Sequence, residues 1–363
     1  MNALPFLLAA SVVAPPDPAR PGPHEGYERV TLADGVYAFL APEGRTGTVQ
    51  GNSLAVVGSD GVLVVDTGQF PALTRRVIAD LRKLTDQPVR FVVNTHWHGD
   101  HLLGNHEYKL AFPSAVIVQH VETRRLADQS YPGFAKSAAT EFPQYVTDMR
   151  ATVARGTRRS GQPLSDLEKE YYRRQADELE AAIRELDHMP HTPANVAFEG
   201  RLSVHLGSRE VQVLHLGRGN TGGDTVVFVP DAKVAAAGDM VVYPSPYAFG
   251  SRLGEWTETL RKLEGLGATS VVPGHGPVLQ GNAYLEVVIA LLQETLRQVA
   301  AAVSEGLSLD ETRKKVDLSS YRQKLAGDDY WRGRAFDEFY LHAAVEQAYK
   351  EAKGEPIVEG AEG

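Results

Sequence analysis

Apolar residues in the first part of the chain come in short runs that glycine, aspartate and asparagine interrupt. Between residues 27 and 66 the runs YERVTL, VYAFLA, NSLAVVG and GVLVVD are rich in β-branched and aromatic residues, which is typical of strands. Helical spacing follows, with apolar residues of one face at Leu73, Val77, Ile78, Leu81 and Leu84. The run VRFVVN, residues 89–94, then predicts a buried strand. This order predicts an α/β domain that begins near Tyr27.

The segment from about 120 to 190 is charged, helical in pattern and bounded by proline. Its second half begins with Ser165 and Glu168, a capping box that marks the start of a helix. We expect a helical insertion here, which either roofs a cleft or stands as a solvated hairpin with no role in a site. Strand patterns then resume at 195–214, 225–229 and 233–237, before a helix near 253–266 and a strand at 269–273.

The N-terminal residues 1–26 combine an apolar stretch, LPFLLAASVVA, with a proline-rich segment, PPDPARPGP, that predicts an extended linker. The apolar stretch resembles the core of a secretory signal peptide, but it lacks a preceding lysine or arginine and is too short to span a bilayer. A signal peptide would place the protein in the periplasm or outside the cell. An apolar tail on a cytoplasmic protein is the alternative.

The C-terminal part, residues 281–353, is expected to be a helical extension of the domain at 27–280. One apolar face is formed by Leu285, Val288, Ile289, Leu292, Leu296, Val299 and Val303. These helices could form a homodimer interface. The acidic tail at 354–363 is predicted to be disordered.

Composition narrows the classes of function. The chain of 363 residues carries a formal net charge of −9, so it has no basic surplus with which to neutralise phosphates. This argues against nucleic acid or an anionic membrane as the main partner, and we expect a small-molecule substrate. The chain has no cysteine, so any metal site must use histidine, carboxylates and neutral donors.

A histidine cluster follows the strand at 89–94, where residues 95–101 read THWHGDH. Side chains alternate along an extended segment, so His96, His98 and Asp100 share one side, while His101 points elsewhere as the chain turns. One cation could take the two alternate histidines, and a second could take the Asp100–His101 pair. Zinc takes about four ligands, so further ligands must come from distant strand ends.

Two residues at later strand ends are candidates for these missing ligands. Asp239 follows the small apolar run in AAAGDM, and His275 lies between two glycines in VVPGHGP. A carboxylate at the end of a buried strand costs several kcal/mol unless it is paired or bound to metal. The glycines let the backbone bend tightly around whatever the His275 imidazole contacts.

Taken together, these segments resemble the metallo-β-lactamase superfamily. THWHGDH fits the motif HxHxDH, and VVDTG (64–68), GRGNTGGD (217–224), GDM and PGHG occur in the order typical of that family. The resemblance implies an αββα sandwich with a metal centre at the edge between its two sheets. It also implies that Asp239 bridges two metals, that His275 completes the second metal site and that Asp66 orients ligands without binding metal.

One position departs from the family pattern, because Asn220 stands where the third motif usually has a histidine. An amide oxygen is a weaker zinc ligand than imidazole. Three outcomes are open: Asn220 coordinates, the nearby His215 substitutes, or only the second site fills tightly. His215 and Thr221 could equally support the ligands or simply pack. We expect one or two zinc ions per chain, with iron and manganese as open alternatives.

Five further residues near these motifs are candidates for the wall of a substrate pocket, although each could serve only in packing. They are Trp97, Arg218, Tyr243, Tyr247 and Phe249. Trp97 stands between two of the candidate ligands, and Arg218 could contact an anionic substrate.

The resemblance implies a hydrolase in which metal-bound hydroxide attacks a carbonyl carbon, with Asp100 both binding metal and orienting the nucleophile. An aspartate at 239, where the family's β-lactamases usually have cysteine or serine, favours an ester, lactone or thioester substrate, with a β-lactam left possible. Two alternatives stay open. One is a mononuclear iron oxygenase similar to persulfide dioxygenases, and the other is a catalytically silent scaffold that binds a partner.

Overall fold

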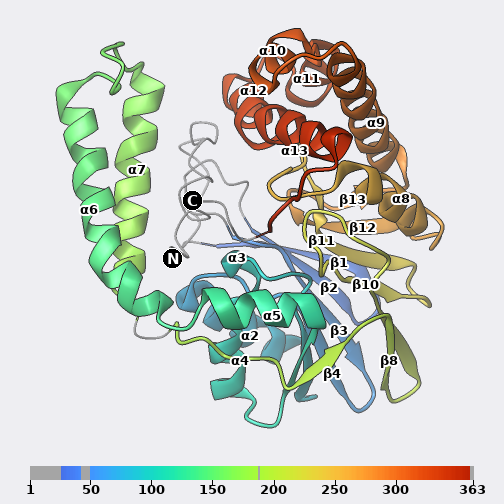
Figure 1. Ribbon diagram of the computed structural model, residues 1–363. Coiled ribbons are helices and arrows are strands. Elements are labelled where there is room, and N and C mark those ends of the chain that lie inside the picture. The colour runs from blue at the N-terminus through green and yellow to red at the C-terminus, as the bar shows by residue number, and fades with distance from the viewer. Residues whose placement is uncertain (1–25, 42–49, 187–188, 360–363) are drawn as a thin grey trace.

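The computed structural model describes residues 26–41, 50–186 and 189–359. In these residues the strands form two sheets that lie face to face, with helices on both outer sides (Figure 1). The first sheet contains, in spatial order, β1 (Glu28–Ala33), β2 (Val36–Leu40), β3 (Ser53–Gly58), β4 (Gly61–Val65), β5 (Val89–Val93), β6 (Val116–His120) and β7 (Val196–Phe198). The second contains β13 (Leu279–Gln280), β12 (Ser270–His275), β11 (Val234–Val242), β10 (Val226–Val229), β9 (Arg209–Leu214) and β8 (Arg201–Leu206).

Period-two burial along the strands explains why two sheets and two outer helical layers form. On β4, Leu63 and Val65 pack into the core between the sheets, whereas Val62 and Val64 pack into the core beneath the outer helices. Successive side chains of a strand point to opposite faces, so this strand is apolar on both of them. Because neighbouring strands show the same pattern, each sheet has to be covered on both faces, by the other sheet on one and by helices on the other. The predicted αββα sandwich is confirmed.

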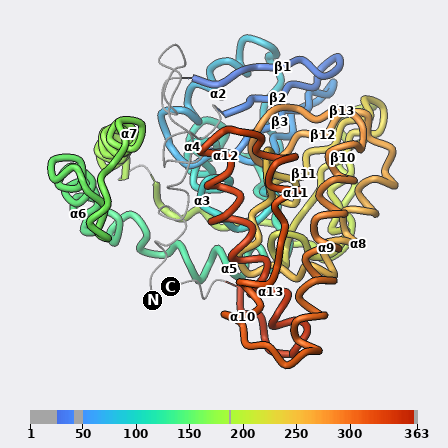
Figure 2. Tube along the Cα trace, turned by 90° about the horizontal axis from the view of Figure 1, so that it is seen from above, coloured from blue at the N-terminus to red at the C-terminus, as the bar shows by residue number. Residues whose placement is uncertain are grey.

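The outer helices show the apolar faces that the sequence predicts. On the first sheet lie α2 (Pro71–Leu84) and α4 (Asn105–Ala111), which bury Val77, Leu81 and Tyr108. On the second lie α8 (Leu253–Glu264) and α9 (Ala283–Ser304), which run side by side (Figure 2).

By length and composition alone, α9 is apolar enough to cross a membrane. Such a test is weak evidence for one helix, because a core helix of a folded domain also passes it. Here Leu285, Leu292 and Val299 of α9 pack into the core on the outer face of the second sheet. We therefore interpret α9 as a core helix.

A helical hairpin projects from the first sheet between β6 and β7 (Figure 1). It follows α5 (Val121–Ser130) and consists of α6 (Phe134–Arg155) and α7 (Asp166–Ile183). The predicted capping box is present: the Ser165 hydroxyl accepts from the Glu168 backbone N–H, and the Glu168 carboxylate accepts from the Ser165 backbone N–H. Apolar residues of the hairpin belong to one buried cluster with Tyr131 and with Trp97 of the histidine-rich loop, so the hairpin is joined to the site region.

After α9 the chain forms a group of short helices that packs against α8 and α9 and against the loop after β11. They are α10 (Leu309–Lys315), α11 (Ser319–Ala326), α12 (Tyr330–Ala335), the π-helix η2 (Phe336–Leu341) and α13 (His342–Lys353). Trp331 of α12 stacks on Tyr171 of α7 with ring centroids 5.2 Å apart, and both rings are buried. The hairpin and the C-terminal helices therefore hold each other through this contact.

The possible signal peptide and most of the proline-rich linker lie outside the described residues, as do residues 360–363 of the tail. Residues 354–359 are described, and they depart from the expected disordered tail. They leave α13 and return to the loops at the edge of the sandwich, where Glu359 makes two hydrogen bonds.

Candidate metal centre

Strand direction brings the candidate ligands together. Strands β4, β5 and β6 are parallel to one another, and β11 is parallel to β12 in the other sheet. Carboxyl ends of parallel strands lie at the same edge of a sheet, which is where such folds place reactive groups. Asp66 follows β4, THWHGDH follows β5, Asp239 lies within β11 and His275 ends β12.

The histidine-rich loop is extended only as far as His98, whose φ of −68° and ψ of 146° are those of extended, polyproline II-like backbone. The short helix α3 (Gly99–Leu102) begins at the next residue. The alternation expected for an extended chain therefore stops there. The helical turn brings both Asp100 and His101 back to the centre, and His101 does not point elsewhere.

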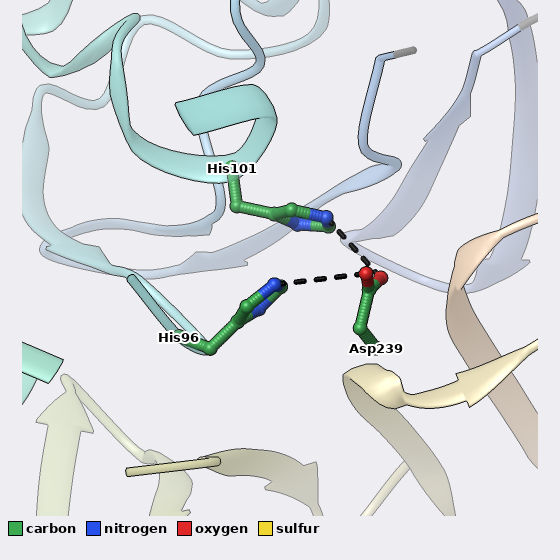
Figure 3. A group of neighbouring side chains, drawn as sticks. All are labelled: His96, His101 and Asp239. Atoms are coloured by element: carbon green, nitrogen blue, oxygen red, sulfur yellow. Dashed lines mark ion pairs between the residues drawn. The ribbon is translucent and has the colours of Figure 1, made fainter. Parts of the chain in front are cut away.

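Six side chains converge at this edge. His96 Nε2 lies 2.9 Å from His98 Nδ1 and 3.6 Å from Asp239 Oδ2, and His101 Nε2 lies 3.2 Å from Asp239 Oδ1 (Figure 3). His275 Nε2 lies 3.3 Å from the same Asp239 oxygen. Asp239 thus contacts ligands on both sides, the position expected of a bridging carboxylate.

The second half of the centre is built around Asp100. Its Oδ2 lies 3.1 Å from His275 Nε2 and 3.3 Å from His101 Nε2, and the two imidazole nitrogens are 3.3 Å apart. Within the described residues, two groups of three potential ligand atoms lie within 4.8 Å of one another: His96, His101 and Asp239, and Asp100, His101 and His275. His101 Nε2 lies within reach of both groups, but one imidazole nitrogen binds one cation, so these distances are compatible with the expected pairing of His101 with Asp100.

Asp66 fixes the orientation of His101. Its Oδ2 lies 2.8 Å from His101 Nδ1, while the backbone N–H and the hydroxyl of Thr95 each donate to this carboxylate at 2.7 Å. A carboxylate on the distal nitrogen of an imidazole holds the other nitrogen toward a metal. Asp66 thus lies behind the ligands, in the supporting position that its motif implies.

Burial and mutual charge set the protonation of these groups. Burial lowers the pKa of His98 to about 4 and lowers that of His96 well below its ordinary value. Burial acts in the same direction on His275, but the Asp239 and Asp100 carboxylates outweigh it and raise its pKa to about 9. For Asp239, burial is outweighed by the charges of His275 and His101, which hold its pKa well below the ordinary value.

These side chains fit a divalent metal. Without a bound cation, buried carboxylates and imidazoles packed this closely would have to neutralise one another's charge. Nitrogen and carboxylate donors in this number are a usual zinc set, and a shared carboxylate is suited to two cations. His96, His98 and Asp239 would hold one ion, and Asp100, His101, Asp239 and His275 would hold the other.

Comparison with known proteins decides the family. Residues 46–275 match the family model of the metallo-beta-lactamase superfamily. The chain belongs to the metallo-beta-lactamase superfamily. Members of this superfamily typically bind divalent metals, and the histidine and aspartate groups described here are positioned for that role.

Individual relatives of the superfamily are distant. A linear primary-alkylsulfatase from Pseudomonas sp. (strain ATCC 19151) is 26% identical over 273 residues, which cover 71% of this chain and 48% of that protein. The chain thus spans about half the length of this curated relative. The alkylsulfatase and the superfamily match support a metal-dependent hydrolase in general terms.

Solved metallo-β-lactamases share the fold. One from Pontibacter korlensis has a TM-score of 0.51 and 21% identity, covering 74% of this chain and 99% of the other. A mono-zinc form of another, from Pseudomonas aeruginosa, has a TM-score of 0.51 and 18% identity, covering 75% of this chain and 97% of the other. At this identity the likeness concerns the fold alone.

Asn220 stands where the superfamily usually has a histidine, and its surroundings show how the substitution is accommodated. Its side chain is fully buried, and Nδ2 donates to the Tyr247 carbonyl at 2.7 Å. This bond fixes the amide orientation, while Oδ1 has no hydrogen-bond donor among the described residues. A buried hydrogen-bond acceptor without a donor is rare in folded proteins, and a bound cation would interact with this oxygen in place of a donor.

The other predicted supporting residues contact Asp224 and His120. His215 Nδ1 donates to the Asp224 carbonyl at 2.9 Å, and its ring stacks on His120 with centroids 4.1 Å apart. The Thr221 hydroxyl donates to the Asp224 carboxylate. His215 is therefore held by a backbone carbonyl and by His120, and Thr221 supports Asp224.

Aromatic side chains border the His275 side of the centre. The Tyr247 ring lies 5.8 Å from the His275 ring, and Phe339 packs against both Tyr247 and Phe249 with centroids 5.0 and 5.8 Å apart. Sequence reasoning missed Phe339, because nothing local in its π-helix points to the site. Tyr243 instead packs on Tyr284.

Trp97 and Arg218, the remaining pocket candidates, lie near an unexpected residue. The Trp97 indole Nε1 donates to Glu359 Oε1 at 3.0 Å, and the Gly222 backbone N–H donates to Glu359 Oε2 at 2.8 Å. The Arg218 charge acts on the same carboxylate. The sequence contained no signal for this long-range contact.

Proposed function

We propose that this protein is a zinc-dependent hydrolase that cleaves an ester-type bond, namely a carboxylic ester, a lactone or a thioester. The observation that supports this proposal best is the position of Asp239, which contacts His96, His101 and His275 at the edge where both sheets meet. One carboxylate shared between two ligand groups is suited to a dinuclear hydrolytic centre.

The chain's own residues have distinct tasks in this proposal. Bound zinc would lower the pKa of a coordinated water to about 7 and polarise a carbonyl oxygen. Asp100, whose side chain is 16% exposed, is the carboxylate of the centre most open to an incoming substrate and can orient the attacking water. Asp66 and Thr95 keep the His101 ring fixed, so little rearrangement is needed during reaction.

The aspartate at position 239 supports an ester, lactone or thioester over a β-lactam as the carbonyl substrate. The superfamily's β-lactamases usually have cysteine or serine at this position, whereas an aspartate is similar to the lactonase and thioesterase branches. A second carboxylate also adds negative charge that can be shared by two cations. We therefore rank esters, lactones and thioesters above β-lactams.

A second candidate reaction is hydrolysis of a sulfate ester. It is favoured by the relative that is a linear primary-alkylsulfatase and by the anion-binding donors of Trp97 and Gly222 next to the ligand loop. In this case the same centre would act on an alkyl sulfate instead of a carbonyl compound.

A substrate panel tests the proposal. Zinc-loaded protein is assayed with p-nitrophenyl acetate, a γ-lactone, an acyl thioester, a chromogenic cephalosporin and decyl sulfate, before and after chelation. We expect zinc-dependent turnover of a carbonyl ester, abolished in Asp239→Ala and retained in the exposed-site control Asp60→Asn. Preference for decyl sulfate would select the second candidate. Stoichiometric iron with oxygen consumption, or no metal and no turnover, would overturn both.

A further inference from the structure

The segment after α13 brings a carboxylate to the loops of the metal centre. Figure 1 shows it running down from the end of α13 toward the sandwich. Its last described residue, Glu359, is half-buried and accepts hydrogen bonds from Trp97 and Gly222, which come from two different loops. The carboxylate is thus held on both oxygens by donors far away in sequence.

Arg218 adds a positive charge to the same place. A methyl group added at Gly222 would lie 2.9 Å from Glu359 Oε2 and 3.0 Å from Arg218 Nη2, so all three groups border one small volume. Burial raises the pKa of Glu359, while the hydrogen bonds from Gly222 and Trp97 and the charge of Arg218 oppose the shift. An indole N–H, a backbone N–H and a guanidinium together are donors suited to an oxyanion.

This cradle adjoins the candidate metal ligands. Trp97 stands between His96 and His98 in the chain, and its ring lies 4.8 Å from the His98 ring. Gly222 follows Asn220 by two residues. The cradle therefore borders the loop that carries the candidate ligands.

We propose that Trp97, Gly222 and Arg218 form an oxyanion-binding subsite of the active site, and that Glu359 occupies it as an internal competitor of a sulfate or carboxylate group on substrate or product. The assignment of the site to catalysis rests on the proposed function, whereas oxyanion binding itself does not. Tethering six residues beyond Lys353 gives Glu359 a high effective concentration at the cradle.

The competition has a quantitative consequence. A binding site that is free only part of the time shows an affinity reduced by that fraction. If Glu359 fills the cradle about nine-tenths of the time, its removal tightens oxyanion binding about tenfold. A purely structural role for Glu359 predicts a change in stability without this change in affinity.

The test uses the full chain, zinc-loaded and chelated, with inorganic sulfate and acetate as separate probes. Binding is followed by calorimetry and by the ¹⁵N-indole signal of Trp97, which is assigned with Trp97→Phe. We expect Glu359→Gln to tighten sulfate binding about tenfold. Adding Arg218→Gln to this variant should remove the gain in affinity. The control variant Glu355→Gln, at an exposed position, should bind sulfate as wild type does. A preference between sulfate and acetate identifies the class of oxyanion.

Two results would overturn the subsite: sulfate that leaves the Trp97 signal unmoved in every variant, or equal affinities in wild type and Glu359→Gln. Kinetics separate this failure from failure of the proposed function. With turnover established, Glu359→Gln should lower KM for an anionic ester more than it lowers KM for a neutral ester of the same length. Tightened sulfate binding without turnover of any substrate would leave the subsite standing and refute only the hydrolase.

Discussion

The Asp66 carboxylate lies 2.8 Å from Nδ1 of His101, and this contact leaves Nε2 of the imidazole facing Asp100, Asp239 and His275. A residue that binds no metal thus decides which nitrogen of a ligand faces the centre. Asp66 adopts a positive φ of 55°, which aspartate and asparagine tolerate better than most residues.

Asp66→Asn tests this relationship while keeping the shape and backbone preference of the side chain. We expect metal affinity to fall roughly 10- to 100-fold, because the charge that holds His101 in its tautomer is lost. Competition with a chromophoric chelator measures the change, and Asp60→Asn, on the surface, serves as the matched control. Unchanged affinity would mean that packing alone orients His101.

A second prediction concerns metal affinity and Asn220, whose Oδ1 has no hydrogen-bond donor among the described residues. We expect Asn220→Ala to weaken the metal held by His96 and His98, and Asn220→His to strengthen it, because imidazole is the better zinc ligand. Elemental analysis and chelator titration of wild type and both variants measure this. If Asn220→Ala loads like wild type, the amide oxygen is not a ligand.

Asp224 predicts a pH dependence of stability. Burial raises its pKa to about 8 from 3.8, against the hydrogen bonds of Thr221, and its Oδ2 has no donor among the described residues. The folded protein therefore retains a proton that the unfolded chain releases above about pH 4. The stability linked to this proton is fully present below pH 4 and is lost as pH rises toward 8, by at most about 1.4 kcal/mol per pH unit.

Asp224→Asn removes this titration with little change of shape. Urea unfolding of chelated protein is measured at several pH values between 4 and 8. As the pH rises, the free energy of unfolding should fall more for wild type than for the variant. Parallel curves over this range would show that Asp224 is ionised in the folded state.

Trp331 predicts how the hairpin is held. Its buried ring stacks on Tyr171, so Trp331→Ala should cost about 3 to 5 kcal/mol and loosen α7 from the C-terminal helices. Hydrogen exchange should rise in α7 more than in α2. Leu167→Ala, at a half-exposed position of α7, is the control. Equal exchange in the two variants would contradict this role.

Much of the fold follows from local pattern. The strand expected at 89–94 is Val89–Val93, and the helix read from Leu73 to Leu84 is Pro71–Leu84. These elements could be predicted because burial on one or two faces imposes a period that short segments display. The side chains that converge on the centre were also named from the sequence, because strand ends and glycines mark them locally.

What could not be predicted depends on contacts between distant segments. The position of His101 within reach of both ligand groups follows from the turn at Gly99 together with the placement of Asp239 from the other sheet. Phe339 and Glu359 reach the site because the C-terminal helices pack against α8 and α9 and against the loop after β11. The contacts of His215 could not be predicted either, because its hydrogen bond to the Asp224 carbonyl and its stacking on His120 join segments that are apart in the chain.

The division of the ligands between two sheets has a consequence for how the protein is made. Four of the candidate ligands lie within residues 96–101, but His275 comes 174 residues after His101. A nascent chain therefore exposes four of the six candidate ligands long before the ribosome has translated His275. The full set exists only after synthesis has passed residue 275, so a metal that needs all of these side chains can be bound completely only late in biogenesis.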